Sequence, residues 1–215
     1  MANEIRDIPL FPLGTVLFPG MQLPLQLFEP RYLQMFQDIS HADSCFGVVL
    51  IKEGVEVGAP AVPFDIGTIA RVVQHENTDD GRIVLMSVGQ QRFRSIQVLQ
   101  QLPYMTARIE LLPPDDAGAT QAGPLVKEKF LEYARLVAGM ANEWVRDVPF
   151  PDAPADLAYL VARNLEVSMP VKQGLLEMDT AEECLQAEVE ILEMVTEHLR
   201  RRVRQEGPSQ RFSAN

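Results

Sequence analysis

The sequence predicts an α+β protein in which a mostly antiparallel β-barrel is followed by an α-helical bundle. Up to about Leu112 the apolar residues follow the period of β-strands, and after Gly123 they recur every three or four positions. A stretch rich in Pro, Gly and Ala separates the two parts. Strands first and helices afterwards are typical of an α+β chain. We therefore expect a barrel in residues 1–115, a helical bundle in 123–206 and a flexible tail in 207–215.

Strand periodicity is clearest in Tyr104–Leu112, where every second residue is apolar: Met105, Ala107, Ile109 and Leu111. This is the pattern of a strand with one buried face. Cys45–Ile51 and Ile66–Val73 are instead almost entirely apolar. Such runs are expected of strands that are covered on both faces or closed into a barrel.

Two local signals predict how neighbouring strands are connected. Asp80-Gly81 predicts a tight hairpin turn between strands at 66–74 and 83–88. In Arg92–Leu99 the apolar residues change from odd to even positions, which predicts a β-bulge near Arg94–Ser95.

Helix starts are marked by Pro30, which suits a first helical turn, and by Thr180 with Glu183, which form a capping box. The last helix is acidic in its first half and ends with the basic run Arg200–Arg204. That order complements the helix dipole. The same basic run leaves RNA binding open as an alternative function.

The opening segment, Ile8–Gly20, spaces three prolines and two glycines among bulky apolar residues. Proline cannot donate a hydrogen bond to a neighbouring strand. We therefore expect an edge strand that bends and leaves the sheet.

Composition disfavours several classes of partner. The formal net charge is −11, and an acidic chain repels nucleic acid because Lys and Arg supply most non-specific affinity. Cys45 and Cys184 lie far apart in apolar or helical runs, so we expect buried, reduced thiols. There is no recognisable signal peptide and no apolar run of about 20 residues that could span a bilayer. These features predict a cytoplasmic protein without a membrane partner.

Residue patterns for catalysis are missing from the sequence. His41, His75 and His198 are not at metal-ligand spacing from another His, Cys or carboxylate. Neither a GxxxxGK[ST] phosphate loop nor a GxSxG nucleophile elbow occurs. We therefore assign no catalytic residue, metal or cofactor, and we expect a protein that is not an enzyme.

The opening block resembles the start of the Lon substrate-binding domain, in Pro9–Leu13, Leu17–Gly20, Leu23–Leu25 and Phe28–Tyr32. Weaker matches follow in order, at Gly67-Thr68-Ile69-Ala70, at Gly89 with Arg92-Phe93, and at Lys172–Glu177. The resemblance implies a pseudouridine-synthase-and-archaeosine-transglycosylase-like (PUA-like) barrel with a helical bundle. It also implies a stand-alone module that binds unfolded or extended polypeptides and assists protein quality control, with a protease acting in trans as a further partner.

Binding an unfolded chain requires an exposed apolar surface. The irregular opening is the first place where we expect one, and the residues are Phe11, Leu17, Phe18 and Met21, with Tyr32 nearby. A second expected site is a pocket at the junction of barrel and bundle, near Pro149, Phe150 and Pro151, because pockets form where domains meet. One alternative function is that of an adaptor or small-ligand-binding module that serves one dedicated partner.

Overall fold

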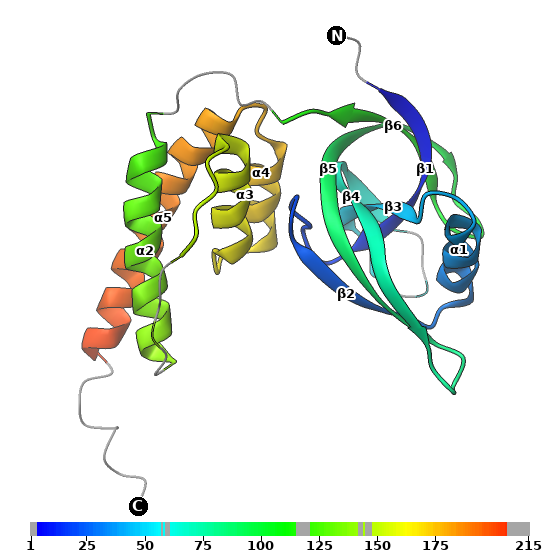
Figure 1. Ribbon diagram of the computed structural model, residues 1–215, viewed down its shortest axis with the longest axis horizontal. Helices are drawn as coiled ribbons and strands as arrows, with labels where there is room; N and C mark the ends of the chain where they lie inside the picture. Colours follow the sequence, from blue (N-terminus) through cyan, green and yellow to red (C-terminus); the bar gives the residue numbers. More distant parts are fainter. Residues whose placement is uncertain are drawn as a thin grey trace, which may run out of the picture. The chain divides into compact units, whose positions relative to one another are not determined.

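The computed structural model describes residues 4–56, 58, 61–114, 121–141, 144 and 148–205. Within these ranges the chain forms six strands and five helices, and the predicted α+β class is confirmed (Figure 1). The elements, in chain order, are β1 (Ile5–Leu13), β2 (Gln22–Leu27), α1 (Pro30–Ser40), β3 (Cys45–Glu53), β4 (Val62–Asn77), β5 (Ile83–Gln100), β6 (Thr106–Leu112), α2 (Gly123–Met140), α3 (Pro154–Asn164), α4 (Met169–Glu177) and α5 (Ala181–Gln205).

The chain divides into two compact units. The barrel unit consists of the described residues up to Pro114 together with Ala162–Met178, and the helical unit consists of the remaining described residues. The predicted boundaries place residues 123–206 in the bundle. The end of α3 and all of α4 instead group with the strands, so the barrel unit is built from two separate stretches of sequence.

Five strands of the barrel unit form a closed ring (Figure 1). The pairing order is β5-β4-β3-β1-β6, and a further pairing of β6 with β5 closes it. The long strand β5 makes closure possible, because its first half pairs with β2 and β4 while its second half pairs with β6. Every pairing is antiparallel except that of β1 with β3.

Strand β1 lies between β3 and β6, so the expected edge strand is wrong. Its first half, Ile5–Pro9, pairs with β6, and its second half pairs with β3 from Leu10 onward. The Leu10 N–H donates to the Met105 carbonyl on the β6 side. Backbone N–H groups alternate in direction along a strand. The nitrogen of Pro9 therefore points toward β3, but the β1–β3 pairing begins only at Leu10. The nitrogen of Pro12 points toward β6, but the β1–β6 pairing has already ended at Pro9. Both prolines therefore fit without removing a hydrogen bond from either ladder.

The edge strand is β2, which pairs with β5 alone. Gly89 donates its N–H to the Met21 carbonyl on the β5 side. Because backbone groups alternate in direction along a strand, those of Leu23, Leu25 and Leu27 also point toward β5. The nitrogen of Pro24 then points to the open edge, and because it carries no hydrogen it cannot donate to another strand there.

The predicted hairpin and bulge are both present. β4 and β5 are joined through a turn in which Gly81 has a φ of 80°, a left-handed conformation that favours glycine. The pairing of β5 with β6 shifts register between Ser95 and Gln97, one residue beyond the predicted position. The predicted alternation before Leu112 is also confirmed, because Met105, Ala107, Ile109 and Leu111 are buried.

Apolar side chains fill both sides of the central strands. One cluster lies inside the ring and includes Leu10, Val49, Phe93 and Ile109. On the other side, residues of β1, β3 and β4 pack against the buried face of α1, which consists of Tyr32, Met35, Phe36 and Ile39. Burial on both faces explains why the sequence of β3 is almost entirely apolar.

In the helical unit, α2 and α5 lie side by side (Figure 1). Ion pairs join Lys129 to Glu193, at 2.8 Å, and Glu132 to Arg200. The predicted capping box is confirmed, since the Glu183 N–H donates to the Thr180 hydroxyl and the Thr180 N–H donates to the Glu183 carboxylate.

Candidate functional site

A cavity of about 320 Å³ opens on the barrel unit where β1 ends and α1 begins. This volume is at the lower end of the range for small-ligand sites. Four segments surround it: the end of β1, the start of α1, the loop after β3 and the loop before β6. The lining residues are Pro12, Glu29, Pro30, Arg31, Tyr32, Val55, Glu56, Gly58, Ala61, Gln101, Leu102, Tyr104 and Met105.

Charged residues at the start of α1 hold the loop after β3 in place. Arg31 forms an ion pair with Glu29 at 2.9 Å, and its Nη2 donates to the Glu56 carbonyl at 3.1 Å. The Glu29 carboxylate also accepts from the Gly58 N–H at 3.2 Å, and the Glu56 carboxylate accepts from the Gly14 N–H. Residues Glu29–Tyr32 of the block that resembles the Lon domain therefore build one wall of the cavity.

Tyr32 forms the buried part of this wall. Its ring centroid is 4.0 Å from that of Phe11, and the Arg31 guanidinium lies 4.5 Å from the ring centroid. Burial raises the pKa of the Tyr32 hydroxyl. The ring is thus fixed between the core and the charged residues that order the loop.

Tyr104 lies on the opposite loop, before β6. Its hydroxyl donates to the Asp38 carboxylate on α1 at 2.6 Å. Burial, together with this hydrogen bond, raises the pKa of Tyr104 to about 12. The contact ties the loop before β6 to α1.

The mouth of the cavity carries exposed apolar side chains. Leu102 is 75% exposed and Val55 is 56% exposed, and both line the cavity. Val98 and Leu99, near the end of β5, are exposed as well. Leu102 and Val55 form what we call the apolar rim. Exposed apolar side chains that border a concavity are typical of a site that contacts a partner.

The structure separates the five residues that we expected to form an exposed patch in the opening segment. Phe11, Leu17 and Phe18 belong to the core, with exposed fractions of 6%, 1% and 0%, so the expectation that they are exposed is wrong. The segment after β1 folds over the barrel, where the Leu17 carbonyl accepts from the Thr68 hydroxyl at 2.6 Å. Met21 is half-buried against the same core, and Tyr32 alone of the five lines the cavity.

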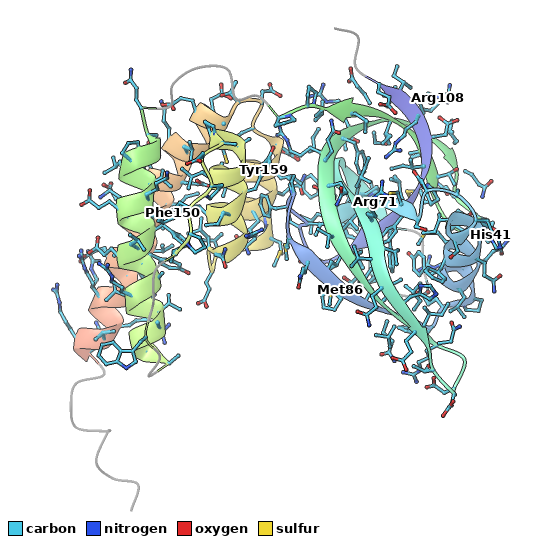
Figure 2. The ribbon with its side chains drawn as sticks, viewed as in Figure 1. His41, Arg71, Met86, Arg108, Phe150 and Tyr159 are labelled. Atoms are coloured by element: carbon cyan, nitrogen blue, oxygen red, sulfur yellow. The ribbon has the colours of Figure 1, made fainter. Side chains whose placement is uncertain are left out.

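The second expected site lies within the helical unit. Phe150 is half-buried, and its ring is 6.2 Å from the Phe130 ring of α2 (Figure 2). The Lys127 ammonium lies 5.7 Å from the same ring. Pro149 and Pro151 flank this contact, and a pocket near these residues stays a prediction.

The sequence does not identify Val55, Leu102 or Tyr104 as site residues. Glu29 and Arg31 lay within the recognised opening block, but their role in ordering a loop depends on contacts with residues 25 to 29 positions away. The residue before Pro103 and the glycine-flanked loop after β3 are weak signals of exposed loops, and nothing in the sequence brings them together.

Within the described part of the chain, no group of three or more His, Cys, Asp or Glu residues could hold a metal ion. His41, labelled in Figure 2, follows the end of α1 and bonds through Nδ1 to the Gln37 carbonyl. His75 packs on the ring of Phe36. Cys45 and Cys184 are buried, as expected, and neither is in a disulfide. None of the helices among the described residues has the length and apolar character that a membrane crossing requires.

Comparison with known proteins agrees with the resemblance in the opening block. The family model described as the ATP-dependent protease La (LON) substrate-binding domain matches residues 7–194. Lon protease of Flavobacterium johnsoniae is 28% identical over 184 residues, covering 82% of this chain and 22% of the relative. Lon protease of Dictyoglomus thermophilum is 27% identical over 207 residues, covering 89% of this chain and 26% of the relative. The chain thus spans about a quarter of the length of these relatives.

Solved structures show the same fold. A Lon N-terminal domain protein from Xanthomonas campestris matches with a TM-score of 0.64 and 27% identity, covering 85% of this chain and 96% of that one. The N-terminal domain of the Lon protease of the Mycobacterium avium complex has a TM-score of 0.59 and 17% identity, with 87% and 98% covered, and supports the fold alone. The family model matches most of the chain, and the protein belongs to the LON substrate-binding domain family.

Proposed function

We propose that this protein is a non-catalytic recognition module that binds unfolded or extended polypeptides, and that the cavity with its apolar rim is the binding site. The observation that carries the proposal is the exposure of Leu102 and Val55 at the mouth of a cavity whose walls include Tyr32 and Met105. Membership of a substrate-binding domain family supports the same function.

The mechanism is binding without chemistry. One bulky apolar side chain of an extended segment enters the cavity, and Leu102 and Val55 cover the neighbouring part of the segment. Burial of apolar surface stabilises the complex by roughly 25 cal/mol for each Å² removed from water, less the cost of ordering the segment. Release to a protease acting in trans requires weak, reversible binding, which suits a small contact area.

The proposal is tested by fluorescence anisotropy with a labelled, permanently unfolded model chain and with the native form of the same chain. Micromolar binding of the unfolded form alone is expected. Val55→Ser and Val73→Ser form a matched pair, because the two valines are 56% and 58% exposed and Val55 alone of the two lines the cavity. Val55→Ser is expected to weaken binding several-fold, and Val73→Ser is expected to leave it unchanged.

Equal binding by both variants would remove the cavity as the site, and no binding to either form of the chain would contradict polypeptide recognition in general. If neither form of the chain binds, a dedicated partner becomes the better hypothesis. That hypothesis predicts that the unmodified protein recovers one partner protein in a stoichiometric amount and that the Val55→Ser variant does not recover it. RNA binding is not favoured, because Arg200 pairs with Glu132 and Arg201 pairs with Glu197.

A further inference from the structure

Charge at the cavity indicates which segments it accepts. Its lining holds two carboxylates, Glu29 and Glu56, and one guanidinium, Arg31. Arg31 is engaged three times over, by the Glu29 carboxylate, the Glu56 carbonyl and the ring of Tyr32. The positive charge is therefore neutralised within the wall, and one carboxylate is left in excess.

Glu56 is that carboxylate. Its side chain accepts from the Gly14 N–H, and among the described residues no Lys or Arg forms an ion pair with it. A third carboxylate, that of Asp38, is not part of the lining and accepts from the hydroxyl of the lining residue Tyr104. The mouth of the cavity thus combines apolar side chains with uncompensated negative charge.

Resting on the proposed function, we infer that the cavity selects polypeptide segments in which a bulky apolar residue lies next to Lys or Arg. The apolar side chain occupies the space bounded by Pro12, Tyr32 and Met105. The long stem of Lys or Arg lies along the apolar rim and keeps its charge in water near Glu56. The ring of Tyr104, which also lines the cavity, attracts the same cation.

The expected preference for Lys or Arg over a neutral residue is small. An ion pair at a solvent-exposed site contributes about 0.2–1 kcal/mol, so the gain in affinity is a small factor and not orders of magnitude. The net charge of −11 attracts any basic segment at long range. A test must therefore separate the local charge of Glu56 from the charge of the whole protein.

Three labelled peptides of equal length test the inference. They share one bulky apolar residue and differ in its neighbours, which are Lys, Gln or Glu. The Lys peptide is expected to bind about 2–5-fold more tightly than the Gln peptide, and the Glu peptide more weakly than either. In Glu56→Gln the ratio of Lys to Gln affinities is expected to fall toward one. The control is Glu53→Gln, which removes an exposed carboxylate that does not line the cavity.

Glu56→Gln keeps an acceptor for the Gly14 N–H, and thermal unfolding checks that the loop and fold survive. Asp38→Asn is the second variant, and it is expected to reduce the Lys preference by a smaller factor. A Lys preference that falls equally in Glu56→Gln and Glu53→Gln would mean attraction by the net charge and would overturn the inference. Equal affinity for the Lys and Gln peptides, with sensitivity to Val55→Ser, would overturn it and leave the proposed function intact. No binding by any peptide would remove both.

Discussion

The guanidinium of Arg92, on β5, donates to the backbone carbonyl of Leu176, near the end of α4, at 2.8 Å. It also donates to the Met178 carbonyl, and the side chain is 5% exposed. The last carbonyls of a helix have no partner within the helix, and a cation there suits the helix dipole. Gln173 adds a hydrogen bond from its amide to the Ile66 carbonyl at 3.0 Å. These contacts explain why α4 groups with the barrel.

Replacement of Arg92 by Ala should destabilise the barrel unit by about 2–4 kcal/mol, because hydrogen bonds to charged groups contribute about 1.5–3 kcal/mol and two carbonyls lose their donor. Denaturant unfolding measures the change. Arg82→Ala is the control, since Arg82 is half-exposed and pairs with Asp80 at the hairpin; a change of at most about 1 kcal/mol is expected there. Comparable losses in both variants would show that Arg92 does not hold α4.

Gly67, the first residue of the matching segment Gly67-Thr68-Ile69-Ala70, leaves no space for a side chain. A Cβ there would meet the Val48 carbonyl oxygen, and it would lie 2.7 Å from Val49 Cγ1 and 2.8 Å from the Phe93 ring. Backbone cannot yield as a flexible side chain can, so Gly67→Ala should cost about 1–3 kcal/mol or more.

Gly174 is the matched control for that substitution. It lies within α4, and apart from its chain neighbours and the backbone of its own helix no described atom is within 4 Å of the position that a Cβ would take. Gly174→Ala should stabilise the protein by roughly 0.5–1 kcal/mol, because Ala restricts the unfolded chain and favours the helix. Thermal unfolding of the two variants should therefore move in opposite directions. A loss of stability in both would mean that the space around Gly174 is closed.

Substitutions at Phe18 and Leu102 should distinguish a core residue from a residue of the binding surface. Phe18 is fully buried, so Phe18→Ala is expected to cost about 3–5 kcal/mol. Leu102 is 75% exposed, so Leu102→Ser should change stability by at most about 0.5 kcal/mol while weakening binding of an unfolded chain. Chemical unfolding and anisotropy, measured on both variants, check the two effects. A stable Phe18→Ala protein would place that ring outside the core.

Local patterns predicted the local features well. Alternation identified the strand before Leu112, Asp80-Gly81 identified the hairpin, and the change of phase after Arg92 identified the bulge. These features depend on a few neighbouring residues, so they can be inferred without tertiary contacts.

The opening segment shows where such inference fails. Its prolines predicted an edge strand, but β1 pairs on one side in each half, so an interior strand accommodates both Pro9 and Pro12. The apolar character of Leu17 and Phe18 fits a core residue as well as a binding residue, and burial decides between them. The cavity depends on contacts of Glu29 and Arg31 with the loop after β3, and a single sequence carries no signal for contacts between such distant residues.

The hydrogen bond from Tyr104 to Asp38 should be visible in a pH titration. The pKa of Tyr104 is raised from 10.0 to about 12, first by burial and then by the carboxylate. Folded protein therefore keeps this proton at pH values where the unfolded chain has lost it. The resulting stabilisation is fully present below pH 10 and is lost as the pH rises through about 12.

Tyrosinate absorbance, recorded as the pH is raised, measures this pKa. The chain has four tyrosines, and subtraction of the Tyr104→Phe titration from that of the unmodified protein isolates the one group. Asp38→Asn should lower the pKa of Tyr104 by removing the negative charge while retaining an acceptor. If the subtracted curve has its midpoint near 10 in the folded protein, the hydroxyl does not donate to Asp38, and the loop before β6 is not tied to α1 in this way.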